Sequence, residues 1–265
     1  MPKKVLIVGG GIGGMRAAIT AAENGHEVIL CEKGDRLGGH IRCEDKVPFK
    51  KHLKEYLDQQ EKKILESNID VRLNTEVTPE YAKEIGADAL IAALGARPVK
   101  PDLPGIDGAN VYGAEEVYVN PDLVKGKAVI LGAGLVGTEL ALYLKSLGKE
   151  ATVLEMAEKM DPGDNSLGVV AIMVQFRENG MQIQFKTKAT RIDEGGVYAE
   201  TEEGEKYFPA DTVIYAVGQE ALSDEAMALH DCAGRFYLLG DCMVPNNIAD
   251  ANKMGKTIAM DIGRI

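Results

Sequence analysis

Residues 4–14 read KVLIVGGGIGG, and residues 127–137 read KAVILGAGLVG. Each stretch is an apolar run, rich in β-branched residues, followed by glycines in the order G-x-G-x-x-G. Continuous apolar runs of this length are typical of parallel strands covered on both faces. In a βαβ unit the first glycine permits a tight turn, the second lets the backbone approach a diphosphate, and the third lets the helix pack on the strand. The glycines are Gly9, Gly11 and Gly14 in one copy and Gly132, Gly134 and Gly137 in the other.

The segments after each copy complete the unit. Helical patterns cover residues 15–24 and 138–147, and short apolar strands follow at 27–31 and 151–154. Each second strand ends at an acid, Glu32 or Glu155, where a ribose hydroxyl pair is bound in such folds. A helix N-terminus presents unpaired amides to the diphosphate, so no basic side chain is required. The sequence therefore predicts two dinucleotide sites.

The negative charge of the strand-end acid distinguishes NADH from NADPH. A carboxylate accepts hydrogen bonds from a 2′-hydroxyl and repels a 2′-phosphate. No arginine occurs in residues 156–159, so Glu155 favours NADH over NADPH. Lys159 is the cation that keeps NADPH open as the alternative.

The remaining pattern predicts an α/β fold of two nested Rossmann-like dinucleotide-binding domains with a small antiparallel β meander. The first domain comprises residues 1–106 and 211–265, and the second, residues 107–210, is inserted within it. Three prolines in residues 97–104 interrupt regular structure and indicate a domain crossing. The other expected elements are helices at 48–67 and 248–262, strands at 69–73, 89–94, 211–217 and 236–239, and meander strands at 182–185, 196–201 and 206–209.

Composition and charge exclude several classes of partner. The 265 residues carry a formal net charge of −11, which disfavours nucleic acid and anionic membrane surfaces. The apolar runs are strand-length and stop at glycines, and the first residues lack the pattern of a secretory signal, so a cytoplasmic location is expected. The cysteines, Cys31, Cys43, Cys232 and Cys242, have neither metal-knuckle nor redox-dithiol spacing and are expected to be small buried side chains. No metal site is predicted.

Further segments make the order of motifs specific: EKGDRLGG at 32–39, AALGARP at 92–98 and LGDCMVP at 239–245. With the two glycine motifs, they resemble the two-dinucleotide-binding flavoprotein family that includes the disulfide reductases. More closely, the chain resembles the FAD/NAD-binding C-terminal half of the group formed by 2,4-dienoyl-CoA reductase, 2-enoate reductase and trimethylamine dehydrogenase. The resemblance covers nearly the whole chain.

The resemblance implies that the first domain binds FAD and the second binds NADH. Gly38 and Gly39 would pass close to the FAD phosphates, Val77 would lie near the adenine, and Asp241 would bond the ribitol or phosphate region. The helix that starts near Ile248 would point its N-terminus at the isoalloxazine. The implied FAD residues are Gly9, Gly11, Gly13, Gly14, Glu32, Lys33, Gly38, Gly39, Val77, Gly95, Gly240, Asp241 and Ile248. The implied NAD residues are Gly132, Gly134, Leu135, Val136, Gly137, Glu155 and Gly218.

Glu139 has two interpretations. By the resemblance, it would face the nicotinamide or the flavin edge as a catalytic residue. Alternatively, it is an acid near the start of a helix that interacts with the helix dipole.

The leading functional hypothesis is hydride transfer from NADH to flavin N5, with electrons passing to an FMN or iron–sulfur partner domain or subunit. The barrel and the cluster cysteines of the enoate and dienoyl reductases have no counterpart in this sequence. Three alternatives remain open: a scaffold that holds ADP without chemistry, a disulfide reductase, and a single-cysteine peroxidase or oxidase. The sequence also leaves a homo-oligomer open.

Overall fold

A computed structural model describes residues 1–161 and 166–263. The chain forms two compact units, and each is assembled from separate segments. Unit 1 comprises Met1–Asp45, Phe49–Arg97 and Gln219–Ile265, and unit 2 comprises Lys46–Pro48 and Pro98–Gly218. The main crossings thus lie at 97/98 and 218/219, whereas the sequence placed them at 106/107 and 210/211.

Unit 1 is built on a parallel sheet with strand order β15-β4-β1-β2-β3. The central strands are buried on both faces, which explains their unbroken apolar sequence. The strands are β1 (Lys4–Val8), β2 (Glu27–Cys31), β3 (Asp70–Arg72), β4 (Ala89–Ala92) and β15 (Arg235–Leu238).

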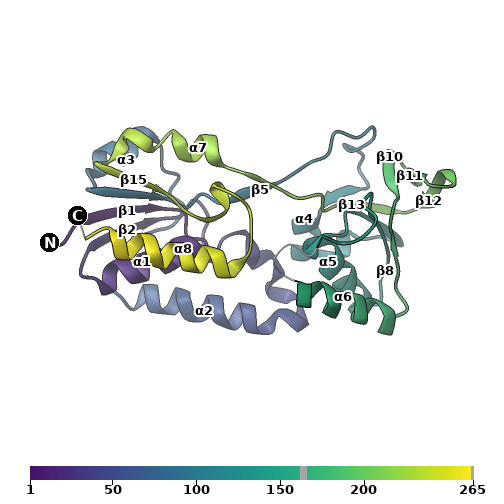
Figure 1. Ribbon diagram of the computed structural model, residues 1–265, viewed down its shortest axis with the longest axis horizontal. Coiled ribbons are helices and arrows are strands. Elements are labelled where there is room, and N and C mark those ends of the chain that lie inside the picture. The colour runs from purple at the N-terminus through teal and green to yellow at the C-terminus, as the bar shows by residue number, and fades with distance from the viewer. Residues whose placement is uncertain (162–165, 264–265) are drawn as a thin grey trace. The chain divides into compact units, whose positions relative to one another are not determined.

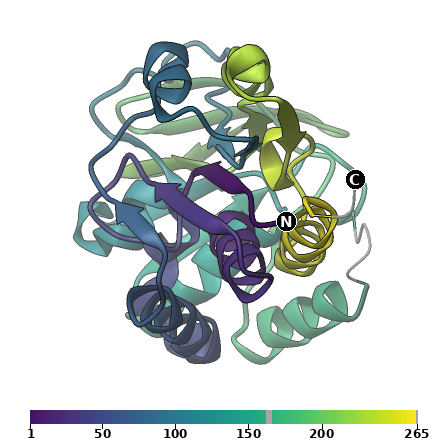
Figure 2. The same cartoon turned by 90° about the vertical axis from the view of Figure 1, so that its left-hand side faces the viewer.

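Helices cover both faces of this sheet (Figures 1 and 2). One face carries α1 (Ile12–Glu23), α2 (Lys51–Leu65) and α8 (Ile248–Asp261), whose apolar residues form one core with β1 and β2. The other face carries α3 (Pro79–Ile85) and α7 (Ser223–Met227) over a second core. Helices α1 and α8 pack closely, and they can do so because Gly255 of α8 has no side chain. A Cβ at Gly255 would lie 2.5 Å from the Gly13 carbonyl oxygen of α1.

Unit 2 repeats the parallel plan with strand order β6-β13-β7-β8-β9. Helix α5 (Leu135–Ser146) packs on β7 and β8 and is flanked by α4 (Ala114–Val119) and α6 (Ser166–Glu178). The strands are β6 (Val111–Gly113), β7 (Lys127–Leu131), β8 (Glu150–Leu154), β9 (Ile183–Gln184) and β13 (Thr212–Tyr215).

A three-stranded antiparallel sheet joins the core of unit 2. It consists of β10 (Lys188–Asp193), β11 (Gly196–Thr201) and β12 (Gly204–Pro209). Its apolar side chains, Ile192 and Val197 among them, share a cluster with Val129 and Val213 of the parallel sheet. The predicted fold class, parallel Rossmann-like sheets with a small antiparallel sheet, is confirmed.

Some predicted elements need correction. Residues 182–185 were assigned to the meander, but β9 pairs with β8 in parallel, and β10 is the strand that was missed. The helices that follow the two glycine motifs, α1 and α5, begin earlier than predicted, at Ile12 and Leu135. The last glycine of each motif, Gly14 or Gly137, therefore lies inside the first helical turn. The proline-rich crossing still contains a short strand, β5 (Ala96–Pro98), which pairs with β14 (Gln219–Ala221). None of the described helices is both long and apolar enough to cross a bilayer.

Candidate dinucleotide sites

The first turn of unit 1 uses two glycines for reasons internal to the protein. Gly9 has φ +108°, and its amide donates to the Cys31 carbonyl at 2.8 Å. A Cβ at Gly9 would collide with the Ala93 carbonyl oxygen, and one at Gly14 would collide with the Gly9 carbonyl oxygen. These two glycines therefore serve the tight turn and the close packing of helix on strand.

Unit 2 repeats this turn. Gly132 has φ +102°, and its amide donates to the Leu154 carbonyl at 2.9 Å. A Cβ at Gly132 would collide with the Ala216 carbonyl oxygen, and one at Gly137 with the Gly132 carbonyl oxygen. The two sequence copies are thus two copies of one structure.

The middle glycines have no such internal reason. Gly11 and Gly134 have φ of −69° and −68°, which any residue adopts. Beyond the adjoining backbone, no described atom lies within 4 Å of a Cβ built at Gly134, and the nearest such atom at Gly11 is the Gly39 Cα, 3.9 Å away. Each of these glycines is the N-cap of its helix, and among the described residues no side chain caps either helix. Both turns therefore keep an open approach to uncapped helix amides, as a diphosphate requires.

The strand-end acids are held in the same way in both units. In unit 1 the carboxylate of Glu32 accepts from the amides of Gly10 and Gly34, both at 2.7 Å. In unit 2 the carboxylate of Glu155 accepts from the amides of Ala133 and Ala157, both at 2.8 Å. An ionised carboxylate has about four acceptor positions, so each acid retains capacity for a ribose hydroxyl pair.

The repeat extends to a loop that the sequence did not reveal. Asn74 and Lys186 both have φ +51°, and their amides donate to the carbonyls of Gly34 and Ala157 at 2.8 and 2.9 Å. The next residue in each loop, Thr75 or Thr187, donates its amide to the carbonyl of the strand-end acid at 2.9 Å. The loop that carries each acid is therefore fixed from a neighbouring strand.

The Gly38-Gly39 pair lies against the first turn of unit 1, and its predicted approach to the FAD phosphates stays a prediction. The Gly38 amide donates to the Gly10 carbonyl at 2.8 Å, and Gly38 forms a parallel bridge with Gly11. Both glycines have positive φ, +118° and +70°. The backbone of this loop thus reaches the same open end of α1 as the fingerprint glycines.

The other residues implied for FAD occupy varied positions in unit 1. A Cβ at Gly13 would lie 3.3 Å from the Leu239 side chain, which places the strand end before Gly240 next to α1. Asp241 accepts from the Asn246 amide at 3.2 Å, and Ile248 begins α8, which Asn247 caps. Val77 packs against the second core, Gly95 has φ +80°, and Lys33 is exposed. Their roles toward a cofactor stay predictions.

Four of the residues implied for NAD, Gly134 to Gly137, lie at the start of α5. Leu135 and Val136 form the first turn, and the Val136 carbonyl accepts from the hydroxyl of the buried Tyr118 at 3.1 Å. Glu139 is half-buried on α5, and Gly218 has φ +117°. Both interpretations of Glu139, as a catalytic residue or as an acid that interacts with the helix dipole, remain predictions.

The cysteines are mostly sequestered. Cys31, Cys232 and Cys242 are buried, and Cys43 is half-buried. Burial raises the pKa of the Cys31 thiol, which keeps it protonated and weakly nucleophilic. The Cys242 thiol donates to the carbonyls of Ala92 and Leu239. Among the residues that the structure describes, no three His, Cys, Asp or Glu side chains gather as metal ligands.

Comparison with known families agrees with this geometry. The sequence model described as pyridine nucleotide-disulphide oxidoreductase matches residues 3–255. The chain belongs to this family. Membership confirms the predicted enzyme class, a flavoprotein oxidoreductase, and the predicted cofactor pair, FAD and NAD(H).

Individual relatives narrow the likeness. An NADH oxidase of Thermoanaerobacter brockii is 33% identical over 98% of this chain and 41% of its own length. A cinnamate reductase of Clostridium sporogenes is 32% identical over 98% of this chain and 39% of its own length. A solved 2-naphthoyl-CoA reductase complexed with 2-naphthoyl-CoA superposes with a TM-score of 0.91 at 29% identity, over 98% of this chain and 40% of that one. The chain thus spans about two fifths of these relatives and matches the dinucleotide-binding half of the enoate-reductase group.

Proposed function

We propose that the chain accepts reducing equivalents from NADH, carries them on FAD and passes them to a flavin or iron–sulfur partner domain or subunit of an enoate- or dienoyl-CoA-reductase-like enzyme. The observation that carries this proposal is the pair of open, uncapped helix starts at Gly11 and Gly134. Each lies beside an anchored strand-end acid, Glu32 or Glu155. The names of the relatives, an NADH oxidase and a cinnamate reductase among them, support the direction of electron flow.

The chain's own residues bind and orient. The amides at the start of α1 and α5 would hold the two diphosphates, and the strand-end acids would accept from the ribose hydroxyls. When bound, the nicotinamide and the flavin supply the hydride chemistry, and the protein supplies their alignment. No side chain of the fingerprints needs to donate or accept a proton.

The experiment has two readouts on purified protein. The nucleotide released on denaturation is identified, and FAD is the expected product, whereas ADP would support the scaffold alternative. The FAD-loaded protein is then mixed anaerobically with NADH, and loss of the oxidised flavin absorbance is followed. A persistent oxidised spectrum despite bound FAD and bound NADH would refute the proposal.

A matched variant assigns the two sites. Gly134→Ala leaves unit 1 unchanged, so it should retain FAD while NADH reduces the flavin at least tenfold more slowly at subsaturating NADH.

Dye or quinone reduction measures turnover without the physiological acceptor. Single-turnover reduction of an isolated FMN or iron–sulfur protein then tests onward transfer.

A further inference from the structure

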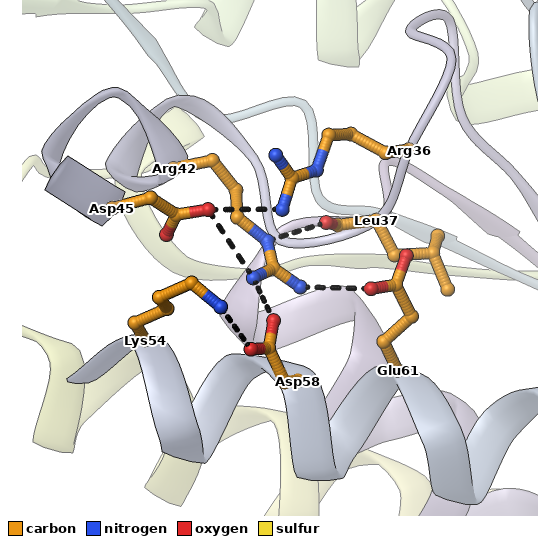
Figure 3. A network of polar contacts seen from close by, with 7 residues as sticks. All are labelled: Arg36, Leu37, Arg42, Asp45, Lys54, Asp58 and Glu61. Carbon is orange, nitrogen blue, oxygen red and sulfur yellow. Dashed lines mark hydrogen bonds and ion pairs between the residues drawn. The ribbon is translucent and has the colours of Figure 1, made fainter. Parts of the chain in front are cut away.

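Arg42 is a buried cation next to the glycine pair of unit 1. It lies on the short 3-10 helix His40–Lys46, and its side chain is 6% exposed. Arginine is rarely buried unless its donors are paired. Its Nε donates to the Leu37 carbonyl at 2.9 Å, and its two terminal nitrogens donate to Asp58 at 2.5 Å and Glu61 at 3.0 Å (Figure 3). Arg42 therefore joins the loop before Gly38 to α2.

The Leu37–Gly38 peptide is held from both ends. Its carbonyl accepts from Arg42, and its amide donates to the Gly10 carbonyl at 2.8 Å. Because the carbonyl and the amide of a trans peptide point in opposite directions, these two bonds fix the peptide plane between Arg42 and the fingerprint turn. A rotation of this peptide would break both bonds.

Gly38 and Arg42 are sterically matched. A Cβ at Gly38 would collide with the Arg42 Nε. Gly38 also has φ +118°, which glycine adopts without strain. The arginine side chain thus fills the space that the missing side chain leaves.

The charge of Arg42 is already satisfied by carboxylates. Besides Asp58 and Glu61, Asp45 lies 3.6 Å from one terminal nitrogen, and Asp45 also pairs with Arg36 at 2.9 Å. Charge-assisted bonds of this kind are strong and directional. A guanidinium committed to three acids and buried beneath the loop is a poor phosphate ligand, although its position beside a diphosphate turn suggests one.

We propose that Arg42 is a positioning residue of the FAD cradle, which holds the Leu37–Gly38 peptide so that the glycine pair lies against Gly11, without contacting the cofactor. Asp58 and Glu61 act through Arg42 by orienting its guanidinium. The inference concerns FAD binding alone and stands whether or not electrons pass to a partner.

The test measures FAD affinity of the apoprotein by quenching of flavin fluorescence, at low and high salt. Arg42→Lys keeps the charge but cannot bridge the Leu37 carbonyl and two acids, so the Kd for FAD should rise at least tenfold with an unchanged salt dependence. Arg97→Lys is the matched control, since Arg97 also pairs with two acids, Glu220 and Glu225, but on an exposed surface; its Kd for FAD should not change.

Two outcomes overturn the proposal. A Kd for Arg42→Lys within twofold of wild type, even with a lower melting temperature, would make Arg42 merely structural. A wild-type Kd that weakens steeply with salt, and an Arg42→Met variant that loses this dependence, would make it a phosphate ligand. If neither Arg42 variant folds, Asp58→Asn with Glu61→Gln decides: a several-fold rise in Kd supports the proposal, and an unchanged Kd overturns it.

Discussion

The Gly10 amide lies 2.7 Å from Oε2 of Glu32, and the same bond joins Ala133 and Glu155 in unit 2 at 2.8 Å. In each unit the strand-end acid therefore anchors the glycine turn that precedes the first helix of the unit. If the acid binds the ribose and the turn binds the diphosphate, as proposed, the two parts of each site hold each other in place.

The first prediction concerns Glu155→Gln. The amide side chain can accept from only one of the two backbone amides, because its nitrogen is a donor. A hydrogen bond to a charged group contributes about 1.5–3 kcal/mol, so the Kd for NADH should rise at least tenfold, measured by calorimetry. Glu150→Gln, at the exposed start of β8, is the control and should bind normally. An unchanged Kd in Glu155→Gln would remove this acid from the site.

The second prediction separates glycines that serve the fold from glycines that serve the ligand. Gly134→Ala fits its backbone conformation and open surroundings, so the melting temperature should change little while the Kd for NADH rises at least tenfold. Gly132→Ala meets the Ala216 carbonyl at positive φ, so this variant should unfold at a clearly lower temperature. Equal melting temperatures in the two variants would contradict the assignment.

The sequence predicted those features that each require a particular residue type. The strands were found because their apolar runs are unbroken, as strands buried on both faces require. The outer glycines of each motif, Gly9 and Gly14 or Gly132 and Gly137, were found because each has a steric function in the turn. Helix α1 was placed too late because Gly13 and Gly14 are poor helix formers, and their cost is offset by close packing on α8 and on Gly9. Strand β9 was assigned to the meander because residues 182–185, QIQF, alternate polar and apolar side chains like an antiparallel strand, although β9 is the half-buried edge of a parallel sheet.

Other features have no local signature. Asn74 and Lys186 share a left-handed conformation without being glycine, and their role depends on partners in another loop. Arg42 is equally hidden, since its hydrogen-bonded acids, Asp58 and Glu61, come from α2, 16 and 19 residues further on. Only the folded arrangement shows that this cation, beside the Gly38-Gly39 pair, is committed to protein carboxylates.

The third prediction concerns coenzyme selectivity. The amide of Lys186 bonds the loop after Glu155, and its ammonium lies 3.1 Å from Glu158 and 2.9 Å from Glu202. These two acids pair with the Lys186 ammonium, which would otherwise be available to the 2′-phosphate of NADPH. Glu158→Gln with Glu202→Gln should therefore lower the Kd for NADPH several-fold and leave the Kd for NADH nearly unchanged. Adding Lys186→Gln should abolish this gain, and a gain that persists would assign it to Lys159.

The fourth prediction is a pH dependence. Hydrogen bonds from Lys54 and then Arg42 hold the pKa of Asp58 below its ordinary value. A carboxylate with a lowered folded pKa stabilises the native state at pH above its unfolded value, roughly 3.9, and this contribution disappears as the pH falls through the folded value. The melting-temperature difference between wild type and Asp58→Asn should be constant from pH 7 to 5 and shrink below about pH 4. A difference that grows in acid would contradict the assigned sign.

The fifth prediction decides whether thiols take part in turnover. Burial protects Cys31, Cys232 and Cys242, and the raised pKa of Cys31 further slows its alkylation. Iodoacetamide applied to the native FAD-loaded protein should leave these three unmodified by mass spectrometry, and NADH-dependent dye reduction should persist. The same reagent in denaturant should label all four cysteines, which shows that access limits the reaction. Loss of dye reduction in step with native labelling would favour the disulfide-reductase alternative, because that chemistry needs a reactive thiolate at the flavin.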